Sequence, residues 1–339
     1  MIKENVSRQS GIELLRIVAM FLILILHVNY AIGLSGATTS LGAFCRTFIE
    51  SLAIVSVDVF VLISGWFGIN FNIKRIIGFV FQCLFFSIFV TTILWLIKGM
   101  PHLDMRSIAG TLFLGKSYYW FVKSYLLLYI LAPVLNSFID NSDKRKTGLI
   151  ILLFFIIMFV YGWSDSMPEF QQGYSSTSFI GLYLLARYVR NYCSNLCSWP
   201  AVRYILIYIA SSLILAIIYL ILIRLKAPYR IYSCVFSYDN PLVIAGAMSL
   251  VLSFAKMNFH SSIINKVAKS SFSVYLLHCG PIAWPLYLSI CCQIYQKYSG
   301  ANMLLTMAAF VAGVFMLAIL LDQIRLISWN YLIKKEKND

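Results

Sequence analysis

The sequence predicts an all-α membrane protein: a polytopic bundle of about ten transmembrane helices. Its 339 residues are 60% hydrophobic and 12% charged, with a mean hydropathy of +0.82, which is more apolar surface than a soluble domain can bury. The apolar residues gather in runs of about 20, the length of a helix that crosses a bilayer. The alternation typical of membrane β-strands is absent.

Ten apolar runs follow one another along the chain without a long polar segment between them. In lipid, a helix satisfies the backbone hydrogen bonds of such a run internally. The fifth run is short, the sixth ends on Arg187 and Arg190, and Pro281 and Pro285 break or kink the ninth. The predicted spans cover residues 12–33, 47–68, 76–97, 118–138, 148–163, 176–193, 203–223, 237–255, 271–292 and 303–327.

The net charge of +14 is explained by membrane topology. The basic residues stand between apolar runs, and no basic tract interleaved with polar residues indicates a nucleic-acid partner. More of them fall on the side of the N-terminus than on the opposite side, which predicts that both termini are cytoplasmic and that the number of spans is even. We expect a single domain over residues 1–339, with a short basic cytoplasmic tail at 331–339.

The first span, GIELLRIVAMFLILILHVNYA, contains Glu13, Arg16 and His27. Ionisable side chains inside a span are costly and usually functional or paired. Arg16 and His27 are eleven positions apart, so they share one face of a helix and lie roughly 16 Å apart along its axis. Glu13, three residues before Arg16, can pair with it. A cation at the cytosolic mouth and a base deep inside predict a lined pocket.

Structural alternatives remain open for these residues. His27 can be a buried imidazole hydrogen-bonded to a neighbouring helix, and Arg16 can be an anchor whose charge reaches the membrane interface. The second span carries Glu50 and Asp58, and Asp58 either orients a histidine, binds a polar substrate or joins two helices by a hydrogen bond. The small residue Gly65 in the same span lets another helix come close.

Two later segments add polar side chains to apolar surroundings. KSYYWFVKSYLLLYILAPVLN contains Trp120 in an aromatic cluster typical of an interfacial belt, with Lys123 just inside it. KSSFSVYLLHCGPIAWP places Tyr275 and His278 in an apolar span, where bundle contacts are the alternative to function. The cysteines lack zinc-site spacing, so no metal is expected, and a phosphate-binding loop for ATP is absent.

Taken in order, four segments resemble the acyltransferase-3 family of membrane proteins. RQSGIELLRIVAMFLILILH is similar to the opening of that family, and its matching positions are Arg8, Glu13, Arg16 and His27. SVDVFVLISGWF, YYWFVKSYLLLYILAPVLN and SSFSVYLLH resemble three later segments of the family. The chain departs from the pattern at Glu13, where Asp is commoner, and at Val61, where a second aromatic residue is common.

The resemblance implies a ten-helix acyltransferase of the cytoplasmic membrane. Such enzymes move an acyl group, usually acetyl, from acyl-CoA to a hydroxyl of a carbohydrate, often in a surface polysaccharide or a lipid-linked glycan. Acyl-CoA, as acetyl-CoA or another thioester, is the expected co-substrate. The cations expected to hold its phosphates at the cytosolic mouth are Arg8, Arg16, Lys74 and Arg75.

The same resemblance gives the remaining residues their expected roles. His27 takes the proton from the acceptor hydroxyl, directly or through an acyl relay. Glu13 orients Arg16, and Asp58 orients the base or the acceptor. The residues expected to contact the acceptor are Trp120, Lys123, Tyr275 and His278.

Two other classes of function suit the composition. Ten spans with intramembrane charges are also typical of a transporter or flippase that performs no chemistry. A non-catalytic partner in glycan assembly is the other alternative. The absence of an inverted repeat and the crowding of polar residues into the first two spans favour the enzyme.

Overall fold

The computed structural model describes residues 9–33, 40–98, 112, 119–164 and 169–336, and this part of the chain is helical without a β-strand. Two short 3₁₀ turns, η2 (Gln171–Gly173) and η3 (Cys234–Phe236), stand between the helices. The α-helices are α1 (Ser10–Ile32), α2 (Ser40–Ala53), α3 (Ser56–Phe67), α4 (Ile73–Lys98), α6 (Trp120–Asp140), α7 (Lys144–Ser164), α8 (Ser176–Tyr192), α9 (Ser194–Cys197), α10 (Ala201–Arg224), α11 (Tyr229–Ser233), α12 (Pro241–Ala255), α13 (Ser262–Ser270), α14 (Phe272–His278), α15 (Ala283–Lys297) and α16 (Gly300–Glu336).

The bundle of membrane-spanning helices confirms the predicted fold class, although the number of spans differs. Eight segments of the described residues are long and apolar enough to cross a membrane, or nine if a bent pair is one span. All ten predicted runs are helical, but α8 has only 17 residues and the ninth run is bent by 86° between α14 and α15. Pro281, which lacks a backbone N–H, lies at that break, as the sequence predicted.

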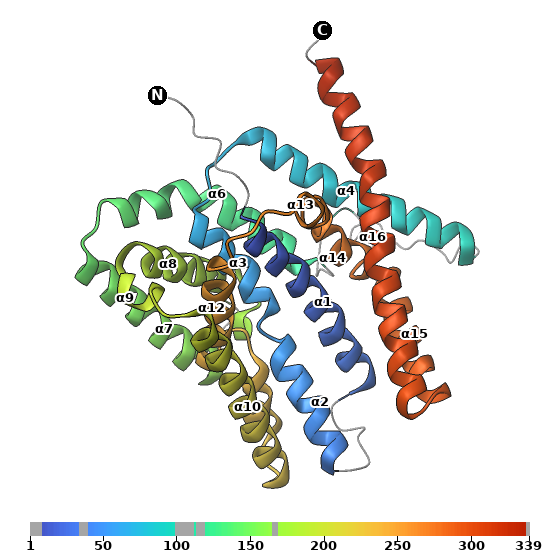
Figure 1. Cartoon of the computed structure of the whole chain (residues 1–339), viewed down its shortest axis with the longest axis horizontal. Coiled ribbons are helices and arrows are strands. Elements are labelled where there is room, and N and C mark those ends of the chain that lie inside the picture. Colours follow the sequence, from blue (N-terminus) through green and yellow to red (C-terminus); the bar gives the residue numbers. More distant parts are fainter. Residues whose placement is uncertain (1–8, 34–39, 99–111, 113–118, 165–168, 337–339) are drawn as a thin grey trace.

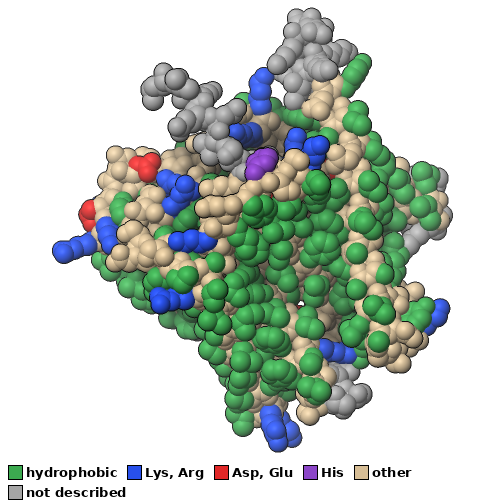
Figure 2. Space-filling view, in the orientation of Figure 1, with side chains coloured by type: hydrophobic (Ala, Val, Ile, Leu, Met, Phe, Trp, Pro, Cys, Tyr) green, Lys and Arg blue, Asp and Glu red, His purple; other side chains and the backbone are tan. Residues whose placement is uncertain are grey.

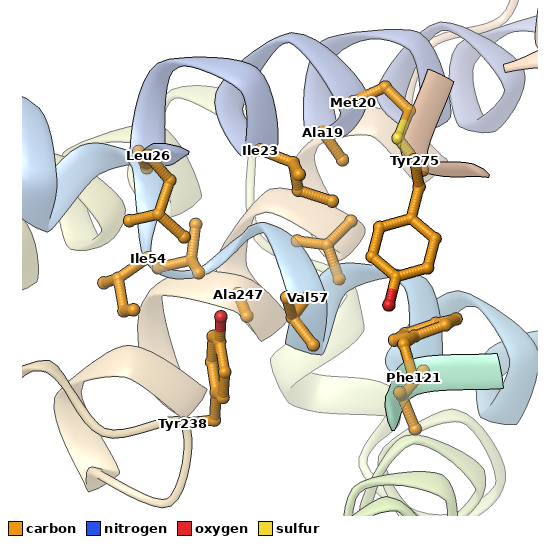
Figure 3. Packing of buried hydrophobic residues seen from close by; sticks show 14 of the residues in the cluster. Ala19, Met20, Ile23, Leu26, Ile54, Val57, Phe121, Tyr238, Ala247 and Tyr275 are labelled. Carbon is orange, nitrogen blue, oxygen red and sulfur yellow. The ribbon is translucent and has the colours of Figure 1, made fainter. Parts of the chain in front are cut away.

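Helix α1 lies in the interior of the bundle (Figure 1). It packs against α2, α3, α12, α13 and α15, and its Leu15, Ala19 and Leu24 are completely buried. Figure 3 shows side chains of α1 that face residues of α3, α6 and α14 in one apolar cluster. Residues far apart in the sequence therefore meet around α1, and any site built on this helix is shared by several elements.

Close approach of helices depends on small residues. A Cβ atom at Gly65 of α3 would lie 2.5 Å from the carbonyl oxygen of Tyr183 on α8, and one at Gly11 of α1 would lie 2.5 Å from that of Phe254 on α12. Both contacts are with backbone, which cannot turn aside as a side chain can. The expectation that Gly65 admits a neighbouring helix is confirmed.

The two ends of the chain point the same way. In Figure 1, α1 begins and α16 ends at the upper end of the bundle, the arrangement that termini on one side of a membrane require. Figure 2 shows hydrophobic side chains over the middle of this face, with most Lys and Arg above and to the left and a few at the lower edge. Helix α16 continues to Glu336, so most of the segment predicted as a tail is helical.

Replacing Gly65 with Ala should destabilise the protein by roughly 1–3 kcal/mol, because α3 and α8 must move apart to admit the new methyl group. Thermal unfolding in detergent, followed by fluorescence-detected size exclusion, measures the effect. Gly313→Ala in α16 is the matched control, since its Cβ meets no atom within 4 Å and should leave the unfolding temperature unchanged or higher. Equal unfolding temperatures for the two variants would contradict this account of the α3–α8 contact.

Candidate active site

Two histidines from distant parts of the chain meet in the bundle interior. His27 Nδ1 on α1 lies 2.8 Å from His278 Nε2 at the end of α14, and their rings are tilted by 54°. His278 is 2% exposed, and its Nδ1 lies 2.5 Å from the carbonyl oxygen of Val274, one helical turn earlier. Trp284 packs edge-on against His27 at 4.7 Å between ring centroids.

The hydrogen-bond network assigns the tautomers of both rings. A carbonyl oxygen only accepts, so Nδ1 of His278 carries a hydrogen and donates it to Val274. In the neutral ring, Nε2 of His278 is then an acceptor, and Nδ1 of His27 donates to it. This leaves Nε2 of His27 with a free lone pair. The pair is thus built as an oriented base, in which a second group fixes the tautomer of the first.

The break after α14 puts His278 where it is needed. Helix α14 ends at His278, and the chain turns at Gly280 and Pro281 before α15 begins. A Cβ at Gly280 would lie 2.8 Å from the hydroxyl of Tyr119, which itself donates to the carbonyl of Leu276 in α14. Tyr119 therefore packs against the bend, and this contact holds His278 at the end of α14.

Cys279 adds a third ligand atom to this pair. Its Sγ, with one ring nitrogen from each histidine, belongs to a group whose atoms all lie within 4.8 Å, close enough to consider a metal ion. However, two nitrogens on one tetrahedral zinc are about 3.3 Å apart at the usual Zn–N bond length. The 2.8 Å between His27 and His278 is a hydrogen-bond distance, so a metal would have to spread the pair.

His27 borders a cavity of about 380 Å³, which we call the aromatic chamber. One wall is a cluster of Trp120, Tyr174 and Tyr238, whose ring centroids lie 4.7–5.8 Å apart. The chamber is also lined by Tyr30, Glu50, Tyr275, Cys279 and Trp284. The chamber that His27 borders is thus lined by aromatic rings with polar tips and by one carboxyl group.

Toward the other end of α1, Arg16 borders two adjoining cavities of about 310 and 210 Å³, which we call the charged vestibule. Arg16, Ser64 and Tyr125 line both parts, and the Ser64 and Tyr125 hydroxyl oxygens are 3.1 Å apart. Arg75 lines the first part and Lys269 the second. Nε of Arg16 is enclosed and has no hydrogen-bond partner among the described residues.

A constriction of about 30 Å³, which we call the neck, lies between these cavities. It shares Phe60, Phe121 and Phe272 with the vestibule, and Trp120 and His27 are among the residues it shares with the chamber. Figure 3 shows much of its lining, which includes Met20, Ile23, Leu26, Val57, Phe121 and Tyr275. The vestibule, the neck and the chamber therefore follow one another along α1, and the neck is narrow and mainly apolar.

The comparison with protein families decides the class of this site. The profile of the acyltransferase-3 family, described as an acyltransferase domain, matches residues 9–323, nearly the whole chain. The chain belongs to the acyltransferase-3 family. No curated protein and no solved structure shows a significant similarity to it. The predicted family is confirmed, and the protein is a multi-pass membrane acyltransferase.

Within this acyltransferase, the predicted donor-site cations divide into three groups. Arg16 and Arg75 line the vestibule. Lys74 is exposed at the start of α4 and is not among the lining residues, while Arg8 lies outside the described residues. Lys269, which sequence reasoning missed, takes a place in the vestibule through the packing of α13 against α1.

The predicted roles of the two acids do not match the geometry. Glu13 and Arg16 both line the vestibule, but the ion pairs of the described residues are those of Asp140 with Arg187 and Asp322 with Arg325. Glu13 therefore does not hold Arg16 by a salt bridge. Asp58 is completely buried, and neither of its carboxyl oxygens has a hydrogen-bond partner among the described residues. The group that orients His27 is His278.

The predicted acceptor contacts are partly assembled at the chamber. Trp120 and Tyr275 line it, and His278 reaches it through His27. Lys123, one turn after Trp120 on α6, is half-buried and is not among the residues that line the chamber. The structural alternative for His27, a hydrogen bond to a neighbouring helix, is confirmed by its contact with His278. The partner is itself one of the predicted site residues.

Replacing His278 with Leu should lower the turnover number for acyl transfer by about 10²-fold or more, because His27 loses the acceptor that fixes its tautomer. Ligand binding at the vestibule should change little, since this cavity lies toward the other end of α1. His278→Gln is the matched variant: its carbonyl oxygen can accept from Nδ1 of His27 and should restore part of the activity. Radiolabelled acyl transfer in nanodiscs measures both, and equal losses in the two variants would contradict the orienting role.

Proposed function

We propose that this enzyme transfers an acyl group, most simply acetyl, from acyl-CoA bound at the charged vestibule to a carbohydrate hydroxyl bound in the aromatic chamber. The observation that carries the proposal is the position of His27. His27 borders both the narrow neck and a chamber large enough for a ligand. The acyl carbon would reach that nitrogen from one side and the acceptor from the other.

The charge of the vestibule supports an anionic donor. Arg16, Arg75 and Lys269 present three cations around it, and guanidinium groups bind phosphate oxygens in a bidentate manner. Arg16 lies roughly 16 Å from His27 along α1, by the helical rise. The bulky nucleotide of CoA would stay in the vestibule, while the slender thioester-bearing arm enters the neck and delivers the acyl carbonyl to His27.

The chemistry of transfer needs one well-placed base. As the acceptor oxygen attacks the thioester carbonyl, its proton passes to Nε2 of His27, and the new C–O bond replaces the C–S bond. The departing thiolate of CoA then takes the proton back from the imidazolium. His278 accepts from Nδ1 of His27 throughout and favours the charged ring in the transition state.

The lining of the chamber supports a carbohydrate acceptor, free or linked to a lipid. The rings of Trp120, Tyr174 and Tyr238 form a continuous apolar wall against which a sugar ring can stack, with hydroxyl tips available for hydrogen bonds. With both termini in the cytoplasm, the vestibule faces the cytosol and the chamber faces outward. The enzyme would then act in the cytoplasmic membrane, in contact with its lipids, on glycans at the outer side.

Deleting this gene should remove an acyl group from the surface or lipid-linked glycans of the producing cell, seen by mass spectrometry as the loss of one acetyl increment per modified sugar. The wild-type gene should restore the increment. His27→Ala should not, at equal protein level in the membrane, because the base is lost. Full activity of His27→Ala would refute the assignment, and glycan trapped inside the cell with unchanged acylation would favour a transporter.

Enlarging a side chain in the neck should separate donor binding from transfer. Val57→Phe places a ring beside a space of about 30 Å³, so the thioester arm should be blocked and transfer should fall by at least about tenfold. Binding of a non-hydrolysable acyl-CoA analogue at the vestibule should persist, which also reports that the variant is folded. Val57→Ala is the matched control and should retain transfer. Undiminished transfer by Val57→Phe would exclude the neck as the path of the acyl group.

A further inference from the structure

The aromatic chamber contains a carboxyl group for which the acyl-transfer chemistry has no use. Glu50 of α2 lines the chamber, and its Oε2 is enclosed with no hydrogen-bond partner among the described residues. The side chain of Asn29 on α1 lies near the same carboxyl group. Glu50 and His27 line the same chamber, so a ligand held there can meet both the carboxyl group and the base.

We infer that Glu50 recognises an ammonium group on the acceptor, so that the enzyme acylates a hydroxyl of a cationic amino sugar. This rests on the proposed function and names the class of its substrate. A buried carboxylate without a counter-charge is costly, and an ammonium group that fills its open lone pairs offsets the cost on binding. An acceptor that carries a carboxylate or phosphate would be repelled.

Among the described residues, no cation lines the chamber beside Glu50, because its lining contains no Lys or Arg. Arg46, one turn earlier on α2, is engaged elsewhere: it donates to the carbonyl of Gly33 and to the Tyr295 hydroxyl, and its guanidinium lies over the Tyr295 ring. The vestibule is lined by three cations and one acid, Glu13, whereas the chamber is lined by an acid without Lys or Arg among the described residues, and this difference matches an anionic donor and a cationic acceptor.

Two further carboxyl groups lie close to the chamber wall. Tyr238, in its wall, is within electrostatic range of both Glu50 and Asp58, and Asp58 is within range of Asp239. Asp239 accepts from the indole N–H of Trp163, while its other carboxyl oxygen has no partner among the described residues. Electron-rich aromatic faces beside these acids add cation–π attraction for an ammonium group.

The same contact would decide which atom of an amino sugar is acylated. A carboxylate that binds the amine favours its protonated form, which has no lone pair and cannot attack a thioester. A hydroxyl of the same ring, placed at Nε2 of His27, remains the available nucleophile. The product would be an O-acyl amino sugar with its amine unmodified.

Three para-nitrophenyl glycosides of one ring geometry test the inference: the glucosaminide with a free ammonium group, its neutral N-acetyl form and the anionic glucuronide. Purified protein in nanodiscs is assayed with radiolabelled acetyl-CoA at a pH where the amine is protonated. We expect kcat/KM for the glucosaminide to exceed that for the N-acetyl form by at least about tenfold, the value of one charged hydrogen bond. The glucuronide should be the poorest acceptor.

Glu50→Gln should remove that preference, lowering kcat/KM for the glucosaminide by about tenfold, to the level of the N-acetyl form. Glu169→Gln, the same change at an exposed position, is the matched control and should behave as wild type. Binding of the three glycosides, measured separately by thermophoresis, keeps the two proposals distinguishable. Selective binding without transfer would refute acyl transfer to these sugars. Transfer or binding without preference for the ammonium form would overturn the inference about Glu50. A preference that persists in Glu50→Gln would overturn it as well.

Discussion

The hydrogen bond between His27 and His278 is the interaction on which the site depends. It joins α1 to the end of α14 across 251 residues of chain, inside a region where unpaired polar groups are costly. The break at Gly280 and Pro281 ends α14 at the partner, and the turn is packed against Tyr119. The bend between α14 and α15 therefore has two effects. It interrupts the ninth predicted span, and it places His278 where it can accept a hydrogen bond from His27.

Around this pair, the fold separates two chemical environments along one helix. The beginning of α1 borders a vestibule with three cations, and its later part borders a chamber with aromatic walls and an acid. Such a separation suits a reaction whose substrates differ in charge and arrive from different sides. Under the proposed function, neither substrate would have to displace the other, and each would meet the histidine pair from its own cavity.

The parts of this structure that depend on local sequence could be predicted from it. The long apolar runs predicted the helices. The spacing of Arg16 and His27 predicted that both lie on one face of α1, and the structure places them in separate cavities. Contacts between distant elements could not be predicted: the orienting role of His278, the entry of Lys269 into the vestibule, and the wall in which Tyr174 and Tyr238 meet Trp120. No periodicity connects such residues. The enclosed position of Asp58 could not be predicted either, because a motif position does not reveal which way a buried side chain faces.

The narrowness of the neck has a consequence for the energy metabolism of the cell. A space of about 30 Å³ lined mainly by apolar and aromatic side chains is too small for a hydrated ion. The protein can therefore contain deep cavities on both sides of a bilayer and remain an electrical insulator. Carrying this enzyme should not dissipate the membrane potential, however many copies the membrane holds.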